Sequence, residues 1–254
     1  MASVLNNPFL IFGITFVVLW LAALLGGRLR ERRHALMDED TRADFSVVQA
    51  ATLTLLGLII GFSFSMATGR YDLRKSYEEA EANAIGTEYV RADLLPADEA
   101  LRVKTLLREY TDLRVRFYSA PPGDVVNQIR ADVGKMQDQL WTAATASANA
   151  TPTPLRALVV AGMNDVLNSE GYTQAAWWNR IPVGAWALMF AIALFCNWLV
   201  GFGTKRLDPK LLLVLPVVVG VAFFLIADID SPRRGVIHIR AQNLESLAES
   251  LKAQ

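Results

Sequence analysis

A run of 23 residues without a charged side chain, residues 47–69, constrains this chain more than any other feature. A helix needs about 20 predominantly apolar residues to cross the hydrocarbon core of a bilayer. The bilayer offers no water to the backbone, so a single segment can satisfy its own amide groups only as a helix. The run therefore predicts a membrane-spanning helix.

Small residues recur at every fourth position in this run, at Gly57, Gly61, Ser65 and Gly69. Residues four apart lie on one helix face, and a face of small side chains lets a neighbouring backbone approach closely. We interpret the run as the central helix of a homo-oligomeric membrane assembly, with these four residues as the helix-packing surface. A helix packed tightly inside a single chain, with no conduction path, would carry the same pattern.

Three further uncharged runs approach spanning length, at residues 9–27, 181–204 and 211–227. Mean hydropathy is +0.28 although 20% of the residues are charged, so the apolar residues must be concentrated in spans. A cluster of basic residues follows the first run instead of preceding it, which favours an uncleaved span over a signal peptide. We expect a multi-pass protein of the lipid bilayer, of the inner membrane if it is bacterial. The net charge of zero gives no argument for nucleic-acid binding.

The charged segment between the second and third runs predicts a helical domain outside the membrane. Turn residues punctuate it at Leu95-Pro96, at 121–123 and at 151–154. Apolar side chains at steps of three and four between these turns predict amphipathic helices: Val103, Leu106, Tyr110, Leu113 and Phe117, then Val126, Ile129, Val133, Met136 and Leu140. No stop signal precedes Leu95, so the second span should continue beyond the bilayer as one helix of roughly 45 residues.

The predicted fold is therefore all-α, with four transmembrane helices and an extramembrane four-helix domain that the second span enters. We expect four regions: residues 1–69 with two spans and a basic loop at 28–46, residues 70–180 with the helical domain, residues 181–230 with the last two spans, and a tail at 231–254. An amphipathic pattern in the tail predicts that it packs on the helical domain.

Two acidic residues, Asp228 and Asp230, lie at the end of the fourth span, where a buried carboxylate is costly. Such carboxylates need partners, and the candidates are basic residues near span ends: Arg233, Arg234, Arg180 and Arg74. A purely structural interpretation is equally open, in which Asp230-Ser-Pro-Arg is a capped turn and Asp230 or Ser231 accepts backbone N–H bonds. A cation site is less favoured, because two carboxylates alone lack a defined ligand set.

Glutamates are frequent on the predicted extension of the second span, at Glu78, Glu79, Glu81 and Glu88. We interpret them as a solvated helix face with local ion pairs to nearby basic residues. Asn83 lies among alanines on the same extension and is expected to be solvated or to face a neighbouring helix.

Enzyme and metal signatures are missing from the sequence. It holds two histidines in separate loops, His34 and His238, and one cysteine, Cys196, within an apolar run. The sequence contains no metalloprotease motif, no nucleophile elbow and no phosphate-binding loop. We expect neither catalysis nor a metal or cofactor.

Three stretches of this chain resemble the bestrophin-like family of membrane proteins: LGLIIGFSFSMATGRYDLRK, EANAIGTEYVRADLLP and DIDSPRRG. They cover the second span, its extension and the exit of the fourth span. The family is named for kinship to bestrophins, which are pentameric anion channels with four spans and a second span that lines the pore. The acidic calcium clasp of animal bestrophins has no counterpart here, so calcium gating is not implied.

The resemblance implies an oligomeric ion channel, for small anions, with a hydrophobic neck on the second span. Positions i, i+4 and i+8 could form that neck in two ways, either as Ile60, Phe64 and Thr68 or as Leu58, Phe62 and Met66. The alternative function is a non-conducting membrane scaffold or sensor whose helical domain binds a partner.

Overall fold

The structure is a computed structural model that describes residues 7–33, 39–204 and 210–253. His34 and parts of the two short basic loops, at 34–38 and 205–209, lie outside the described residues. The described residues form helices and turns, and the chain divides into two compact units. We call Met1–Arg70 with Arg180–His238 the span unit, and Tyr71–Asn179 with Ile239–Gln254 the bundle unit.

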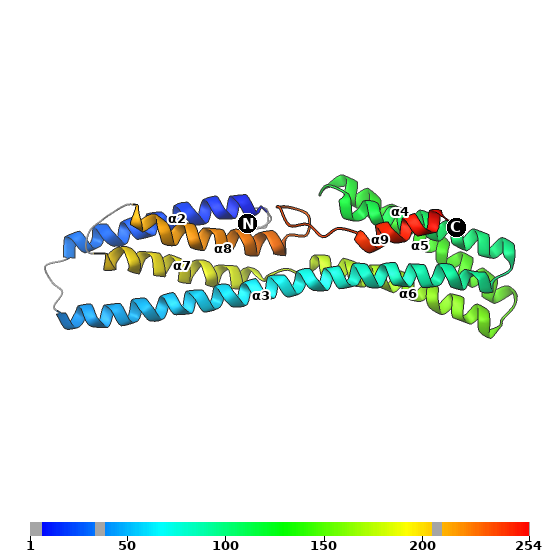
Figure 1. Cartoon of the computed structure of the whole chain (residues 1–254), viewed down its shortest axis with the longest axis horizontal. Coiled ribbons are helices and arrows are strands. Elements are labelled where there is room, and N and C mark those ends of the chain that lie inside the picture. The colour runs from blue at the N-terminus through cyan, green and yellow to red at the C-terminus, as the bar shows by residue number, and fades with distance from the viewer. Residues whose placement is uncertain (1–6, 34–38, 205–209, 254) are drawn as a thin grey trace. The chain divides into compact units, whose positions relative to one another are not determined.

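The span unit contains α2 (Pro8–Arg33), the first part of α3 (Glu39–Arg91), α7 (Val183–Gly203) and α8 (Val214–Asp230) (Figure 1). Four helical segments of the described chain are long and apolar enough to cross a membrane, and they contain the four uncharged runs except for Thr204. The predicted all-α fold with four membrane-length helices is therefore confirmed.

Prolines mark the starts of the last two spans. Pro182 directly precedes α7, and Pro216 is the third residue of α8. A short 3-10 turn, η3 (Leu211–Leu213), leads into α8. Pro216 thus falls in the first helical turn, where the amide hydrogen that proline lacks would have no partner inside the helix.

Helix α3 is longer than expected. It runs for 53 residues, or about 80 Å, because it begins at Glu39, eight residues before the uncharged run. It ends at Arg91 and is followed by the 3-10 turn η2 (Ala92–Leu94), close to the predicted stop at Leu95. The continuity of the second span with the helical domain is confirmed.

The bundle unit combines the second part of α3 with α4 (Ala97–Ser119), α5 (Asp124–Ala150), α6 (Pro154–Trp178) and α9 (Gln242–Lys252) around one apolar core (Figure 1). Gly123 has a φ of +129° in the turn before α5, and the Thr153 hydroxyl accepts the Arg156 amide at the start of α6. The C-terminal helix α9 packs on this core through Leu244 and Leu251, as expected.

The apolar stripe of α5 is confirmed, but that of α4 is shifted. Leu106 and Leu113 are only partly buried, and Leu107 and Arg114 lie in the interior instead. The pattern missed this because an arginine does not count as a core residue. Arg114 is tolerated there because Glu81 of α3 binds it.

Candidate functional site

Helix α3 is the least covered of the membrane-length helices. Only 6% of its most apolar window is buried within the chain, against 28% to 44% in the other three segments. Leu56, Ser63 and Ala67 are its buried residues in this region, and they share one face. Leu53, Ile59 and Ile60 pack partly on the same core, and the face opposite is not covered by the described residues of the chain.

The small residues lie on this uncovered side. Gly57, Gly61, Ser65 and Gly69 are all exposed, and a Cβ on any of the three glycines would meet no atom within 4 Å. We call these four residues the small-residue strip. Packing against the described residues of its own chain does not explain the strip.

Close helix contacts inside the span unit use other glycines. A Cβ on Gly26 of α2 would collide with the backbone of Trp198 in α7, and one on Gly201 of α7 would collide with the backbone of Ala23. These two glycines let α2 and α7 approach closely, as small residues commonly do in membrane helices.

The two alternative neck sets flank the strip. At about 100° per residue, Ile60, Phe64 and Thr68 fall on one side of it, and Leu58, Phe62 and Met66 fall on the other. Phe64 is 42% exposed and Phe62 is 64% exposed, whereas Ile60 partly packs on the core of the span unit. The Thr68 hydroxyl donates to the Phe64 carbonyl at 3.0 Å. The exposed face of α3 therefore carries two bulky ridges with the strip between them.

The two aspartates at the end of α8 bind backbone amides. Asp228 is fully buried, and its two carboxylate oxygens accept the amide hydrogens of Val236 and Ile237 at 2.7 and 2.8 Å. Asp230 accepts the amide of Ile181 at 3.2 Å, ahead of α7, and its Oδ1 lies 3.7 Å from the Arg70 guanidinium. Both carboxylates therefore bind backbone amides, and only the role of Asp230 resembles the predicted capped turn.

The basic residues proposed as partners are distributed differently. Arg70, which the sequence did not single out, makes the ion pair with Asp230. Arg74 donates to the carbonyl oxygens of Ala176 and Asn179 in the bundle unit. Roles for Arg180, Arg233 and Arg234 remain predictions.

Gly235 makes the Asp228 contact possible. Its φ is +113°, and a Cβ there would collide with Oδ1 of Asp228. Only glycine adopts this conformation without strain and leaves room for the carboxylate. The DIDSPRRG stretch thus closes a loop from Asp228 to Ile237 over the end of the span.

The expectation of a solvated glutamate face on α3 is wrong for three of its four members. Glu78, Glu81 and Glu88 are buried, together with Arg74, whereas Glu79 is exposed. Steps of four, three and seven residues place the buried four on one face. We call Arg74, Glu78, Glu81 and Glu88 the buried polar row.

Members of this row bind other helices of the bundle. Glu78 accepts the backbone amides of Asn243 and Leu244, both at 2.9 Å, and so caps the N-terminus of α9. Glu81 binds the Arg114 guanidinium and the Thr173 hydroxyl. The regular spacing was visible in the sequence, but spacing alone does not separate a buried polar face from a solvated one.

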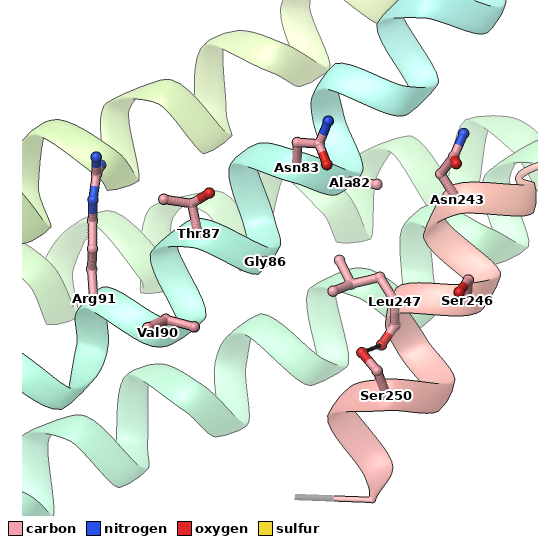
Figure 2. Close-up of a pocket in the computed structure, with 10 residues that line it drawn as sticks. All are labelled: Ala82, Asn83, Gly86, Thr87, Val90, Arg91, Asn243, Ser246, Leu247 and Ser250. Atoms are coloured by element: carbon pink, nitrogen blue, oxygen red, sulfur yellow. Dashed lines mark hydrogen bonds between the residues drawn. The ribbon is translucent and has the colours of Figure 1, made fainter.

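A groove of about 690 Å³ lies between α3 and α9 within the bundle unit. Figure 2 shows Asn83, Thr87 and Arg91 on the α3 side, and Ser246 and Ser250 on the facing α9. Asn83 is exposed there, in agreement with its expected solvated position. The groove presents hydroxyl, amide and guanidinium groups to solvent.

Among known families, the sequence pattern of the Bestrophin-like domain matches residues 9–244. The chain belongs to the bestrophin-like family. The match includes all four uncharged runs, the buried polar row and most of the loop and tail that follow α8, so the resemblance suggested by the three motifs is confirmed.

Solved structures share the bestrophin-like fold. A crystal structure of a bacterial bestrophin homolog from Klebsiella pneumoniae matches with a TM-score of 0.68 and 12% identity, covering 94% of this chain and 97% of that one. A variant of that homolog with one substitution matches with a TM-score of 0.69 and 13% identity, covering 95% and 98%. A search of curated protein sequences found no match. At this identity the likeness establishes the fold, and the chain is a membrane protein of this family.

Proposed function

We propose that this protein is an oligomeric anion channel in which identical α3 helices surround a central axis. The supporting observation is the uncovered face of α3, with its small-residue strip and two bulky ridges. A membrane helix that exposes glycine and serine at regular intervals fits a close contact with another helix better than a contact with lipid. Copies of α3 are the partners that a symmetric homo-oligomer would supply.

Conduction would depend on both features of the exposed face of α3, the small-residue strip and the bulky ridges. The strip lets neighbouring helices approach closely, and one bulky ridge then turns toward the axis. A ring of hydrophobic side chains gates by excluding water, and hydroxyl groups nearby contact the ion. Either Ile60, Phe64 and Thr68 or Leu58, Phe62 and Met66 would form that ring.

Anion flux from liposomes that contain the purified protein tests this proposal. Phe64→Ala and Phe62→Ala are a matched pair, because each removes one phenyl ring from one of the two ridges. The variant on the axial ridge should raise flux by at least about tenfold, since a barrier lowered by about 1.4 kcal/mol changes a rate tenfold. The other variant should leave flux unchanged. Absence of conductance in the unsubstituted protein under any anion gradient would count against a channel.

The second candidate function is a non-conducting scaffold or sensor. The groove between α3 and α9 favours it, because a polar groove of this size offers a partner hydrogen-bonding groups and one guanidinium. Bilayers that contain the protein but show no conductance, together with an intact oligomer, would support this alternative.

A further inference from the structure

Glu88 differs from the rest of the buried polar row. Its side chain is fully buried, and neither carboxylate oxygen has a hydrogen-bond partner among the described residues. An ionised carboxylate in such a place is costly, because burial removes its water and nothing replaces it. Glu78 and Glu81, by contrast, each accept at least two hydrogen bonds.

A glycine on the facing helix makes room for Glu88. A Cβ on Gly162 of α6 would collide with Oε2 of Glu88, so the carboxyl group occupies the space that a side chain would fill. Val159 and Met163 of α6 are fully buried in the apolar core of the bundle. The carboxyl group therefore lies at a dry, close contact between α3 and α6.

Two charged groups act on this carboxyl group. Arg91 lies on the same helix, and its Nη1 is 2.5 Å from the position that a Cβ on Gly162 would take. Its guanidinium is therefore a near neighbour of the Glu88 carboxyl group without forming an ion pair with it. Asp165 of α6 is exposed and adds a negative field. Burial raises the pKa of Glu88 to about 8, with Arg91 opposing and Asp165 adding to the shift. Glu88 lies well beyond the uncharged run, in the bundle unit.

We propose that Glu88 is a proton-binding site that controls the contact between α3 and α6 at Gly162. The protonated carboxylic acid is neutral and lies dry against Gly162. When it releases its proton to solvent, the carboxylate needs donors, and the nearest are the Arg91 guanidinium and entering water. A rising pH thus loosens this contact.

Arg91 also lines the groove between α3 and α9, and Figure 2 shows its side chain extending from α3 away from α9. This inference concerns the bundle unit and does not depend on conduction.

Infrared difference spectroscopy of the purified full-length protein tests the protonation directly. A carboxylic acid C=O band should disappear as the pH is raised through about 8. Glu88→Gln should lack this band, because the amide mimics the neutral acid but cannot titrate. Glu79→Gln is the matched control, an exposed glutamate on the same helix whose removal should leave the band in place. Identical spectra from the unsubstituted protein and Glu88→Gln would overturn the proposal.

Amide hydrogen exchange tests the consequence. When the contact between α3 and α6 opens, Glu88 is exposed to solvent and its pKa returns to the ordinary value of a carboxyl group. At a pH above that value, Glu88 then releases its proton. The protection of the Met163 amide against exchange is compared with that in Glu88→Gln at the same pH. This relative protection should fall up to tenfold per pH unit from about 4.5 upward and level off above about 8. Equal protection in both proteins across this range would refute control by Glu88.

Asp165→Asn keeps the proposal testable if Glu88→Gln does not fold. Asp165 is exposed, so its replacement should be tolerated. Removal of its negative field should shift the midpoint of the infrared band to lower pH. An unchanged midpoint would assign the band to another carboxyl group and contradict the proposal.

Discussion

Asp228 and Gly235 determine the path of the chain after α8, the fourth span. Asp228 is buried because two backbone amides, from Val236 and Ile237, replace its water. Gly235 permits the turn that brings those amides back. The cost of a carboxylate at a span end is thus offset by the backbone that follows it.

Gly235→Ala should destabilise the protein. The substitution forces a side chain into a positive φ, at a cost of about 1–3 kcal/mol, and also pushes a Cβ into Oδ1 of Asp228. The thermal unfolding midpoint of the protein in detergent should fall clearly. Gly134→Ala is the control, since Gly134 lies exposed within α5 with no atom near its Cβ position and should tolerate alanine or gain stability. Equal midpoints for Gly235→Ala and the unsubstituted protein would show that the turn relaxes without strain.

The span half and the bundle half of α3 bury different kinds of residue. The span half buries one narrow face and exposes small and bulky residues, whereas the bundle half buries charged residues that bind the surrounding helices. The buried pair of Glu81 and Arg114 links α3 to α4, and Thr173 extends it to α6. Removing one member of such a pair strands the other charge in the interior.

Arg114→Met should cost about 3–5 kcal/mol of unfolding free energy, because Glu81 then lacks its counter-charge. The double substitution Arg114→Met with Glu81→Leu should recover much of this loss, since both buried charges are gone. Denaturant titration in detergent measures both values. Lys135→Met is the control, because its ion pair with Asp132 is exposed and should contribute less than about 1 kcal/mol. Additive costs of the two single substitutions would contradict direct coupling.

At the scale of the whole molecule, the proposed assembly depends on the small-residue strip. The described residues of the chain leave the strip uncovered, open to lipid or to another chain in the membrane. A second copy fits because glycine removes the side chains that would keep two helix backbones apart.

Gly61→Leu should weaken the oligomer by at least about tenfold, because the new side chain fills the place where a neighbouring helix would pack. Native mass measurement in detergent reports the subunit number directly. Gly13→Leu is the matched control, an exposed glycine of α2 with no atom near its Cβ position. If Gly61→Leu keeps the full mass, the strip faces lipid and the proposed axis is wrong.

Much of the architecture could be predicted from local patterns. The uncharged runs, the turn residues and the lack of a stop signal after Gly69 were enough to predict the four membrane-length helices and the continuity of α3. Those features follow from interactions between residues close in sequence and from the inability of a bilayer to bind backbone groups. The three family motifs gave the kinship that the domain match confirms.

The distribution of buried charge could not be predicted in the same way. Glu88 meets Gly162, Glu81 meets Arg114, and Asp228 meets the amides beyond Gly235, and no local pattern distinguishes these contacts from a solvated face. A helix shows the same spacing whether its polar side faces water or another helix. What separates the two cases is the free energy of removing each charge from water, and that depends on donors supplied by distant parts of the chain.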